Sequence, residues 1–192
     1  TGEWLATVLV ELHKSVEFCR AKPYYEPSSN IRFAQLTAES KAAMLLPEFK
    51  ASQEWLAYAA PQISSQFALQ FYDDGVHNEM APNYQLGVIT NFQTIYNVAK
   101  ANDRLKAFDP EYAEKMRLAC LFIANFIWPD YTWEWFNDTF IQTKNVLLRN
   151  IKSYSSMFPE DNLLKYLASE RKEGHPPTES LIPFVNGGYY IL

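Results

Sequence analysis

Glycine and cysteine are both scarce in this chain of 192 residues, and each scarcity excludes a class of protein. Six glycines and few runs of β-branched residues argue against an all-β sandwich, which needs many tight turns. Cys19 and Cys120 are far apart in the sequence and fit no metal or redox spacing. We therefore expect two buried free thiols, with a disulfide between them left open, and no cofactor or metal site in this chain.

Basic tracts and long apolar runs are missing as well. The net charge is −5, from 17 basic and 22 acidic residues, which is the wrong sign for a nucleic-acid partner. The sequence contains no stretch typical of a transmembrane helix and no signal peptide, so we expect no membrane partner. An exported mature protein and a piece of a longer one would both begin as abruptly as Thr1 and Gly2 do.

Aromatic residues, by contrast, are abundant. Tyr, Phe and Trp make up 16% of a chain that is 48% hydrophobic and 20% charged, a composition typical of a globular protein. Such rings pad a helical core, and they also form the platforms on which sugars stack. Both interpretations stay open for Trp133 and Trp135, which lie in a loop rich in rings and acids, Asp130–Asp138.

Apolar residues recur at steps of three and four along most of the chain, which predicts amphipathic helices. Ser28 or Ser29 is suited to cap the second helix, and Pro61 should kink or split the third. The expected helices cover residues 4–20, 30–46, 52–70, 83–101, 110–128, 140–157 and 161–169.

The last residues differ in composition from the helical part. Residues 172–177 have the composition of a linker, and residues 187–192 predict a β-strand. Helices of this length joined by short loops pack as antiparallel hairpins. The predicted fold is therefore all-α, an array of helical hairpins with a short β-segment beginning at the C-terminus.

Polar side chains gather directly before the fourth helix. The segment Tyr72-Asp-Asp-Gly-Val-His-Asn-Glu-Met-Ala-Pro-Asn-Tyr84 combines a turn with His77, Glu79 and Tyr84. By residue type alone, each has a structural interpretation: a solvated loop histidine, a glutamate serving the helix dipole, and a packing tyrosine. The segment nevertheless resembles the "DG–x–H/Q–x–E–x–(S/A)P–x–Y" signature of the heparinase II/III-like polysaccharide lyases.

Three further segments resemble the same family, in the same order. Ser28-Ser-Asn30 opens a helix as the family's catalytic asparagine does, and Leu45-Leu-Pro-Glu-Phe-Lys50 is similar to the motif that closes that helix. Phe184-Val-Asn-Gly-Gly-Tyr-Tyr-Ile191 resembles the first strand of the family's β-sandwich domain. The resemblance implies that residues 1–171 are the later part of an (α/α) toroid. Residues 172–192 would then be a linker and the start of a β-sandwich domain that lies outside this chain.

The resemblance also implies roles for particular residues. Asn30 matches the asparagine that neutralises a substrate carboxylate, and Tyr84 matches the tyrosine that serves as catalytic acid, or as acid and base. The resemblance further implies that substrate-binding residues line the cleft, namely His77, Glu79, Gln85, Trp133, Trp135 and Asn137. Two positions depart from common members: Gln85 and Ile31 stand where a histidine follows the tyrosine or the asparagine. The family's further catalytic histidines lie in the β-domain.

The implied chemistry is β-elimination on a uronic-acid glycan, with heparan sulfate or a related glycosaminoglycan as first choice. The implied partners are this acidic polysaccharide and the β-sandwich domain, in which a structural metal stays open. The implied location is the periplasm or outside the cell, and residues 1–192 alone should be inactive. Alternatives are a lyase for alginate or another bacterial uronan, a non-catalytic helical carbohydrate-binding or scaffold domain, and a plain α-hairpin interaction module.

Overall fold

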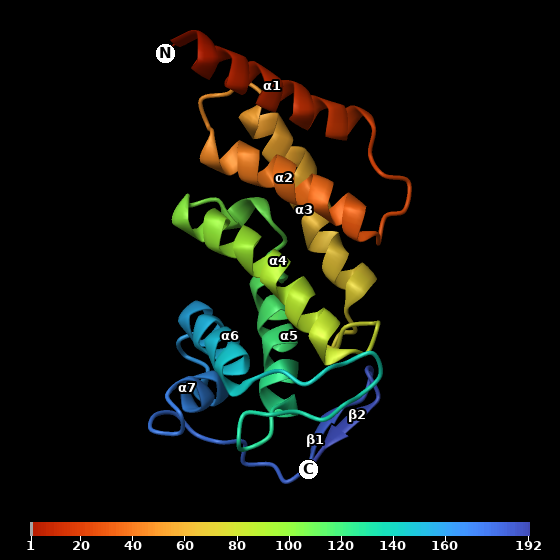
Figure 1. Ribbon diagram of the computed structural model, residues 1–192, viewed down its shortest axis with the longest axis vertical. Coiled ribbons are helices and arrows are strands. Elements are labelled where there is room, and N and C mark those ends of the chain that lie inside the picture. The colour runs from red at the N-terminus through yellow and green to blue at the C-terminus, as the bar shows by residue number, and fades with distance from the viewer. Residues whose placement is uncertain (1) are drawn as a thin grey trace. The chain divides into compact units, whose positions relative to one another are not determined.

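The computed structural model describes residues 2–192, which form two compact units. The first unit comprises the residues up to Leu69 together with Ile95–Pro110, and the second comprises Gln70–Thr94 together with Glu111–Leu192. The elements are α1 (Gly2–Ala21), α2 (Asn30–Leu45), α3 (Ser52–Gln70), α4 (Pro82–Ala101), η1 (Leu105–Ala107), α5 (Tyr112–Phe126), α6 (Lys144–Met157), α7 (Asn162–Ala168), β1 (Ile182–Phe184) and β2 (Tyr189–Ile191). Figure 1 labels the α-helices and the two strands. The all-α prediction with a terminal β-segment is confirmed.

Three helices begin at side-chain caps of the kind that the sequence favours. Ser29 Oγ accepts the backbone N–H of Ile31 at 3.1 Å, so Ser29 and not Ser28 caps α2. Thr143 caps α6, and Asp161 caps α7 by accepting the N–H of Leu164 at 3.1 Å. Each cap satisfies a backbone donor that the helix leaves free, which typically contributes about 1 kcal/mol.

Pro61 does not split α3 in two, and α6 begins later than predicted. Helix α3 continues through Pro61 without a break, and both Pro61 and Ala57, whose carbonyl loses its helical partner, are exposed to water. Helix α6 begins at Lys144 and not near residue 140. The carbonyl of Phe140 accepts hydrogen bonds from Trp133 Nε1 and Asn83 Nδ2, which holds that stretch outside the helix.

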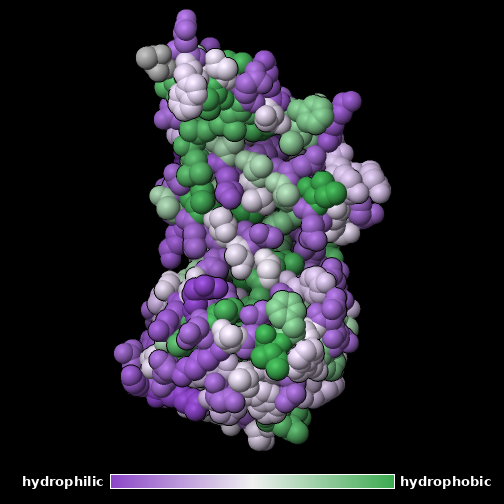
Figure 2. Space-filling view, viewed as in Figure 1, coloured by the Kyte–Doolittle hydropathy of each residue, from purple (hydrophilic) through white to green (hydrophobic). Residues whose placement is uncertain are grey.

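In the first unit the core lies between α2 and α3. Its largest fully buried side chains are Trp55, Leu36 and Ile63, whereas α1 buries only Val16. Hydrophobic side chains are exposed over α1, as Figure 2 shows, and the exposed large residues of this helix are Trp4, Leu5, Val8, Val10 and Phe18.

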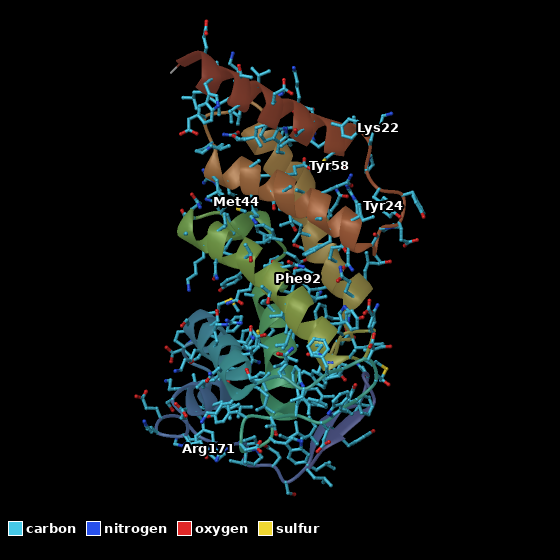
Figure 3. The ribbon with its side chains drawn as sticks, viewed as in Figure 1. Lys22, Tyr24, Met44, Tyr58, Phe92 and Arg171 are labelled. Carbon is cyan, nitrogen blue, oxygen red and sulfur yellow. The ribbon has the colours of Figure 1, made fainter. Side chains whose placement is uncertain are left out.

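A charged network joins the three helices of the first unit. Arg20 lies 3.0 Å from Glu39 (Nε to Oε1) and 2.6 Å from Glu54 (Nη2 to Oε1). The ring of Tyr58, labelled in Figure 3, lies within 6 Å of the guanidinium groups of both Arg20 and Arg32. Glu39 is only 2% exposed, and its burial raises the pKa of its carboxyl to about 7 despite the two arginines.

In the second unit the core is aromatic and forms where α4, α5, α6 and α7 pack. Phe92, labelled in Figure 3, contacts the rings of Phe71 and Tyr112, and the Tyr112 hydroxyl donates to the Phe92 carbonyl at 3.0 Å. Phe122 of α5 packs edge-on against Phe184 of β1 with ring centres 5.1 Å apart. These rings belong to the core, as the first of the two interpretations predicts, whereas other aromatic side chains, among them Trp128 and Trp135, are exposed.

The terminal β-segment is a hairpin and not a single strand. β1 and β2 pair antiparallel, with Ile182 opposite Ile191 and Phe184 opposite Tyr189. The Asn186–Gly188 stretch makes the turn, and Gly188 has a positive φ of 74°.

The state of the two cysteines and the absence of a membrane-spanning stretch are two further expectations that the structure addresses. Cys19 and Cys120 are free thiols, as expected, but only Cys120 of the two is buried, and Cys19 is partly exposed. Burial raises the pKa of Cys120 well above its ordinary value. Across residues 2–192, no helix has the length and apolarity needed to cross a bilayer.

Candidate active site

The segment before α4 is a tight turn packed on α5. The backbone N–H of Gly75 donates to the Tyr72 carbonyl, and the Tyr72 N–H donates to the Val76 carbonyl, both at 2.9 Å. Gly75 has a φ of 87°, and a Cβ there would lie 2.4 Å from the carbonyl carbon of Leu118. Only glycine fits this position, which explains the Asp-Gly pair in the sequence.

Gln85 holds this turn against two helices. Its Oε1 accepts the backbone N–H of His77 at 2.9 Å, and its Nε2 donates to the carbonyls of Gly75 (2.8 Å) and Ala119 (3.0 Å). The side chain is 1% exposed, so its hydrogen-bonding groups are used inside the protein. The geometry therefore gives Gln85 a structural role. The side chain lies inside the protein and does not reach the surface on which a substrate would bind.

His77 is also an interior residue, and Glu79 is not. The imidazole packs edge-on against Phe71, with ring centres 5.2 Å apart, and burial lowers its pKa to about 4. The ring is therefore neutral at pH 7, and its Nδ1 faces the backbone N–H of Glu79 at 3.4 Å. Glu79 itself is exposed at the surface of the loop. His77 therefore supports the turn from inside the protein, and the proposed site does not include it.

Tyr84 presents its hydroxyl at the first turn of α4. The side chain is 47% exposed, and Oη donates a hydrogen bond to Asp138 Oδ2 at 2.9 Å. This bond and the negative charge of Asp138 raise the pKa of the Tyr84 phenol above its ordinary value. The tyrosine is thus protonated at neutral pH, accessible to a ligand, and directed by a carboxylate.

The loop that carries Asp138 is tied to the start of α4 by further hydrogen bonds. Asn137 Nδ2 donates to the Met80 carbonyl at 2.7 Å, and Asn83 is engaged by both the Phe140 carbonyl (3.1 Å) and Gln142 Nε2 (2.9 Å). Met80 and Asn137 both have a φ of 52°, in the left-handed region that residues other than glycine seldom adopt. Backbone strain of this kind persists where surrounding contacts enforce it and is common at functional sites.

The β-hairpin is hydrogen-bonded to the segment that precedes α4. Asp74 Oδ2 accepts the backbone N–H groups of Asn186 (2.7 Å) and Gly187 (2.9 Å), and the Tyr189 hydroxyl donates to the Met80 carbonyl at 2.8 Å. The Met80 carbonyl therefore receives one hydrogen bond from the hairpin and one from Asn137. The segment from Asp74 to Tyr84 is fixed by two distant parts of the chain.

The two tryptophans of the loop have different environments. Trp133 is buried and its Nε1 donates to the Phe140 carbonyl at 3.0 Å, so it belongs to the core. Trp135 is 67% exposed, and neighbouring Phe136 and Phe140 are exposed as well. Of the two predicted stacking rings, Trp135 is the one open to a sugar.

Asn30 is the first residue of α2, exposed beside its Ser29 cap. It belongs to the first unit, whereas Tyr84 and its neighbours belong to the second. The pairing of Asn30 with Tyr84 across a cleft therefore stays a prediction.

The family resemblance implies that Asn137-Asp138 lies in a loop facing the cleft, but reasoning from sequence did not identify Asp138 as the hydrogen-bond partner of Tyr84. Asp138 lies 54 residues beyond it, and no local pattern links the two. The neighbouring Asn137 was expected to bind substrate, but its amide is used on the Met80 carbonyl. Asp74 and Tyr189 were missed for the same reason, because their hydrogen bonds span more than 100 residues.

The helical hairpins are of the kind that forms helical (α/α) toroid domains, and the solved structures to which the chain is similar have this fold. The chain belongs to the family described as Heparinase II/III N-terminus, whose model matches residues 1–166. It is 32% identical to a heparin-sulfate lyase of Bacteroides thetaiotaomicron over the whole of this chain, and 26% identical to one of Pedobacter heparinus.

Solved structures agree with this assignment. A heparinase III structure superposes with a TM-score of 0.91 at 29% identity, covering 99% of this chain and 30% of that one. Heparan sulfate lyase HepC from Pedobacter heparinus superposes with a TM-score of 0.89 at 25% identity, with the same coverage. The chain spans 29% of the length of the Bacteroides relative.

Proposed function

We propose that this chain is the helical part of a polysaccharide lyase that cleaves a uronic-acid-containing glycan by β-elimination. The observation that carries the proposal is Tyr84, a half-exposed, protonated tyrosine whose hydroxyl is directed by Asp138 at the start of α4. Tyr84 occupies the position that the family resemblance assigns to the catalytic tyrosine.

The chemistry requires two groups that this chain can supply. The C5 proton of a uronate is weakly acidic because the adjacent carboxylate is already charged, so the elimination needs that charge to be stabilised. The Asn30 amide, exposed at the start of α2, is suited to donate to the carboxylate. The Tyr84 phenol is suited to protonate the departing 4-linked oxygen.

Heparan sulfate or a related glycosaminoglycan is the proposed substrate, because the matched relatives are named heparin-sulfate and heparan sulfate lyases. Alginate or another bacterial uronan is the alternative, and the net charge of −5 favours it over a highly sulfated chain. We further propose residues 172–192 as a linker and the first hairpin of a β-sandwich domain, and a periplasmic or secreted location for the enzyme.

The test is turnover by the full-length protein. Heparan sulfate, chondroitin sulfate, hyaluronan and alginate are incubated separately, and the ultraviolet absorbance of the unsaturated product is followed. We expect signal on one of them and a loss of at least about 100-fold in kcat for Tyr84→Phe, the size of a missing proton-transfer group. Tyr72→Phe, which changes an exposed tyrosine of the same segment, is the matched control and should stay near wild type.

Two results would contradict this proposal. Absence of unsaturated product on every uronan would remove the lyase assignment and leave a carbohydrate-binding or scaffold domain. Cleavage that survives Tyr84→Phe unchanged would retain the lyase but move its proton donor elsewhere.

A further inference from the structure

Asp138 is the direct partner of the Tyr84 hydroxyl. The 2.9 Å bond runs from Oη to Oδ2, and a carboxylate can only accept, so the proton lies on the tyrosine. Both side chains are exposed, which leaves room for a ligand to approach the same oxygen atoms. The pair is therefore accessible and has a defined polarity.

The position of Asp138 is imposed by its loop. The preceding residue, Asn137, is attached to the Met80 carbonyl, four residues before Tyr84, and Phe140 and Gln142 are attached to Asn83. These bonds hold both sides of Asp138 against the first turn of α4. An exposed carboxylate with no such frame would sample many rotamers and would direct the phenol only part of the time.

We propose that Asp138 is a positioning residue for Tyr84: its carboxylate accepts a hydrogen bond from the phenol, which holds Oη in place and keeps the phenol protonated, so that the tyrosine enters the reaction as proton donor. The proposal rests on the lyase function proposed above and assigns a residue that the function itself does not specify. Asn137 acts with it, by attaching the loop to the Met80 carbonyl.

The proton balance is consistent with this assignment. The C5 proton passes to a base outside this chain, which we assign to one of the histidines that the family resemblance places in the β-domain; the electron pair of the C5–H bond forms the C4–C5 double bond, and the C4–O bond breaks. Tyr84 gives its proton to the departing oxygen, and the resulting phenolate recovers a proton from water. The charge of Asp138 opposes the phenolate, which disfavours Tyr84 as the resting base. A sugar alkoxide is more basic than a phenolate, so the transfer still runs downhill.

The experiment compares Asp138→Asn with Glu134→Gln in the full-length protein. The first removes the charge at Tyr84 and keeps an acceptor oxygen of nearly the same shape. The second removes a charge from the same exposed loop without contact to Tyr84. Ring-labelled tyrosine is titrated by NMR, with the Tyr84 resonance assigned by Tyr84→Phe, and thermal unfolding verifies that each variant is folded.

We expect Asp138→Asn to lower the Tyr84 pKa, because it removes the charge that opposes the phenolate, and Glu134→Gln to leave it unchanged. On substrate, the alkaline limb of kcat/KM should move to lower pH by the same amount, with kcat falling more than KM changes. A Tyr84 pKa that is the same in Asp138→Asn and in the wild type would overturn the proposal. A shift of the acidic limb of kcat/KM would also overturn it, because it would make Tyr84 the base. The titration needs no substrate, so it is decided separately from the lyase assignment, which depends on Tyr84→Phe.

Discussion

Glu39 and His77 are two buried ionisable side chains. Burial shifts the pKa of each in the direction that favours its uncharged form. The pKa of Glu39 is raised from 4.5 to about 7 and that of His77 is lowered from 6.5 to about 4. Their effects on stability have opposite signs. A carboxyl with a raised folded-state pKa stabilises the protein at low pH and loses that contribution as pH rises, whereas a histidine with a lowered pKa loses its contribution as pH falls.

Replacing Glu39 by glutamine should therefore change the pH dependence of stability in a defined window. In the wild type, the contribution of Glu39 is complete below pH 4.5 and falls as pH rises through about 7, because the unfolded state ionises first. The change in the pKa of Glu39 from 4.5 to about 7 corresponds to about 3–4 kcal/mol at most. Glu39→Gln should remove this decline, so its melting temperature should gain relative to wild type between pH 5 and pH 8.

The measurement is thermal unfolding at several pH values, plotted as the difference between variant and wild type. His77 contributes the same slope to both proteins, so the difference isolates Glu39. Glu54→Gln serves as the matched control, because Glu54 also pairs with Arg20 but is exposed. A difference that stays constant across the window would show that Arg20 compensates the burial of Glu39 fully.

At the scale of elements, the helices could be predicted from the spacing of apolar residues, and the cap of α2 could be narrowed to Ser28 or Ser29. Periodicity and capping are local properties, so a single sequence records them. The start of α6 could not be predicted, because what holds Phe140 outside the helix is Asn83, 57 residues away. The same limit applies to the site: Tyr84 follows from its local motif, but its partner Asp138 follows only from the fold.

Asp74 makes a comparable long-range tie, and its removal should loosen the β-hairpin. Asp74→Ala deletes the acceptor of two backbone N–H groups in the hairpin turn, at Asn186 and Gly187. Charge-assisted hydrogen bonds of this kind contribute about 1.5–3 kcal/mol each, partly offset by hydration of the freed groups. We expect faster amide hydrogen exchange in residues 182–191 and, through the Met80 carbonyl, in the segment before α4.

Asp73→Ala is the control, since Asp73 is the exposed neighbour of the same residue type. It should leave exchange in the hairpin as in the wild type. Equal exchange in both variants would mean that packing of Phe184 and Tyr189 on Phe122 holds the hairpin without help from Asp74.

At the scale of the whole molecule, the family could be predicted because four short motifs occur in the family's order across nearly the whole chain. Each motif reflects a local structural requirement, such as the glycine that the turn at Gly75 needs where it packs on α5. The order of the four motifs along the chain is what distinguishes this family from others. The placement of Asn30 relative to Tyr84 is not such a local property, because the two residues belong to different units. Composition alone would have left only a helical, aromatic-rich globular protein.

The same reasoning predicts how the 192 residues behave by themselves. They span 29% of the matched Bacteroides lyase, and the family resemblance assigns further catalytic histidines to the β-domain. His77, the histidine close to Tyr84 in sequence, is buried with a pKa of about 4, so it is a poor substitute base. We therefore expect residues 1–192 to form no more unsaturated product than their Tyr84→Phe variant. Heparan sulfate oligosaccharides should still perturb the fluorescence of exposed Trp135. Substantial cleavage by this chain that Tyr84→Phe abolishes would show that the helical part contains a complete site.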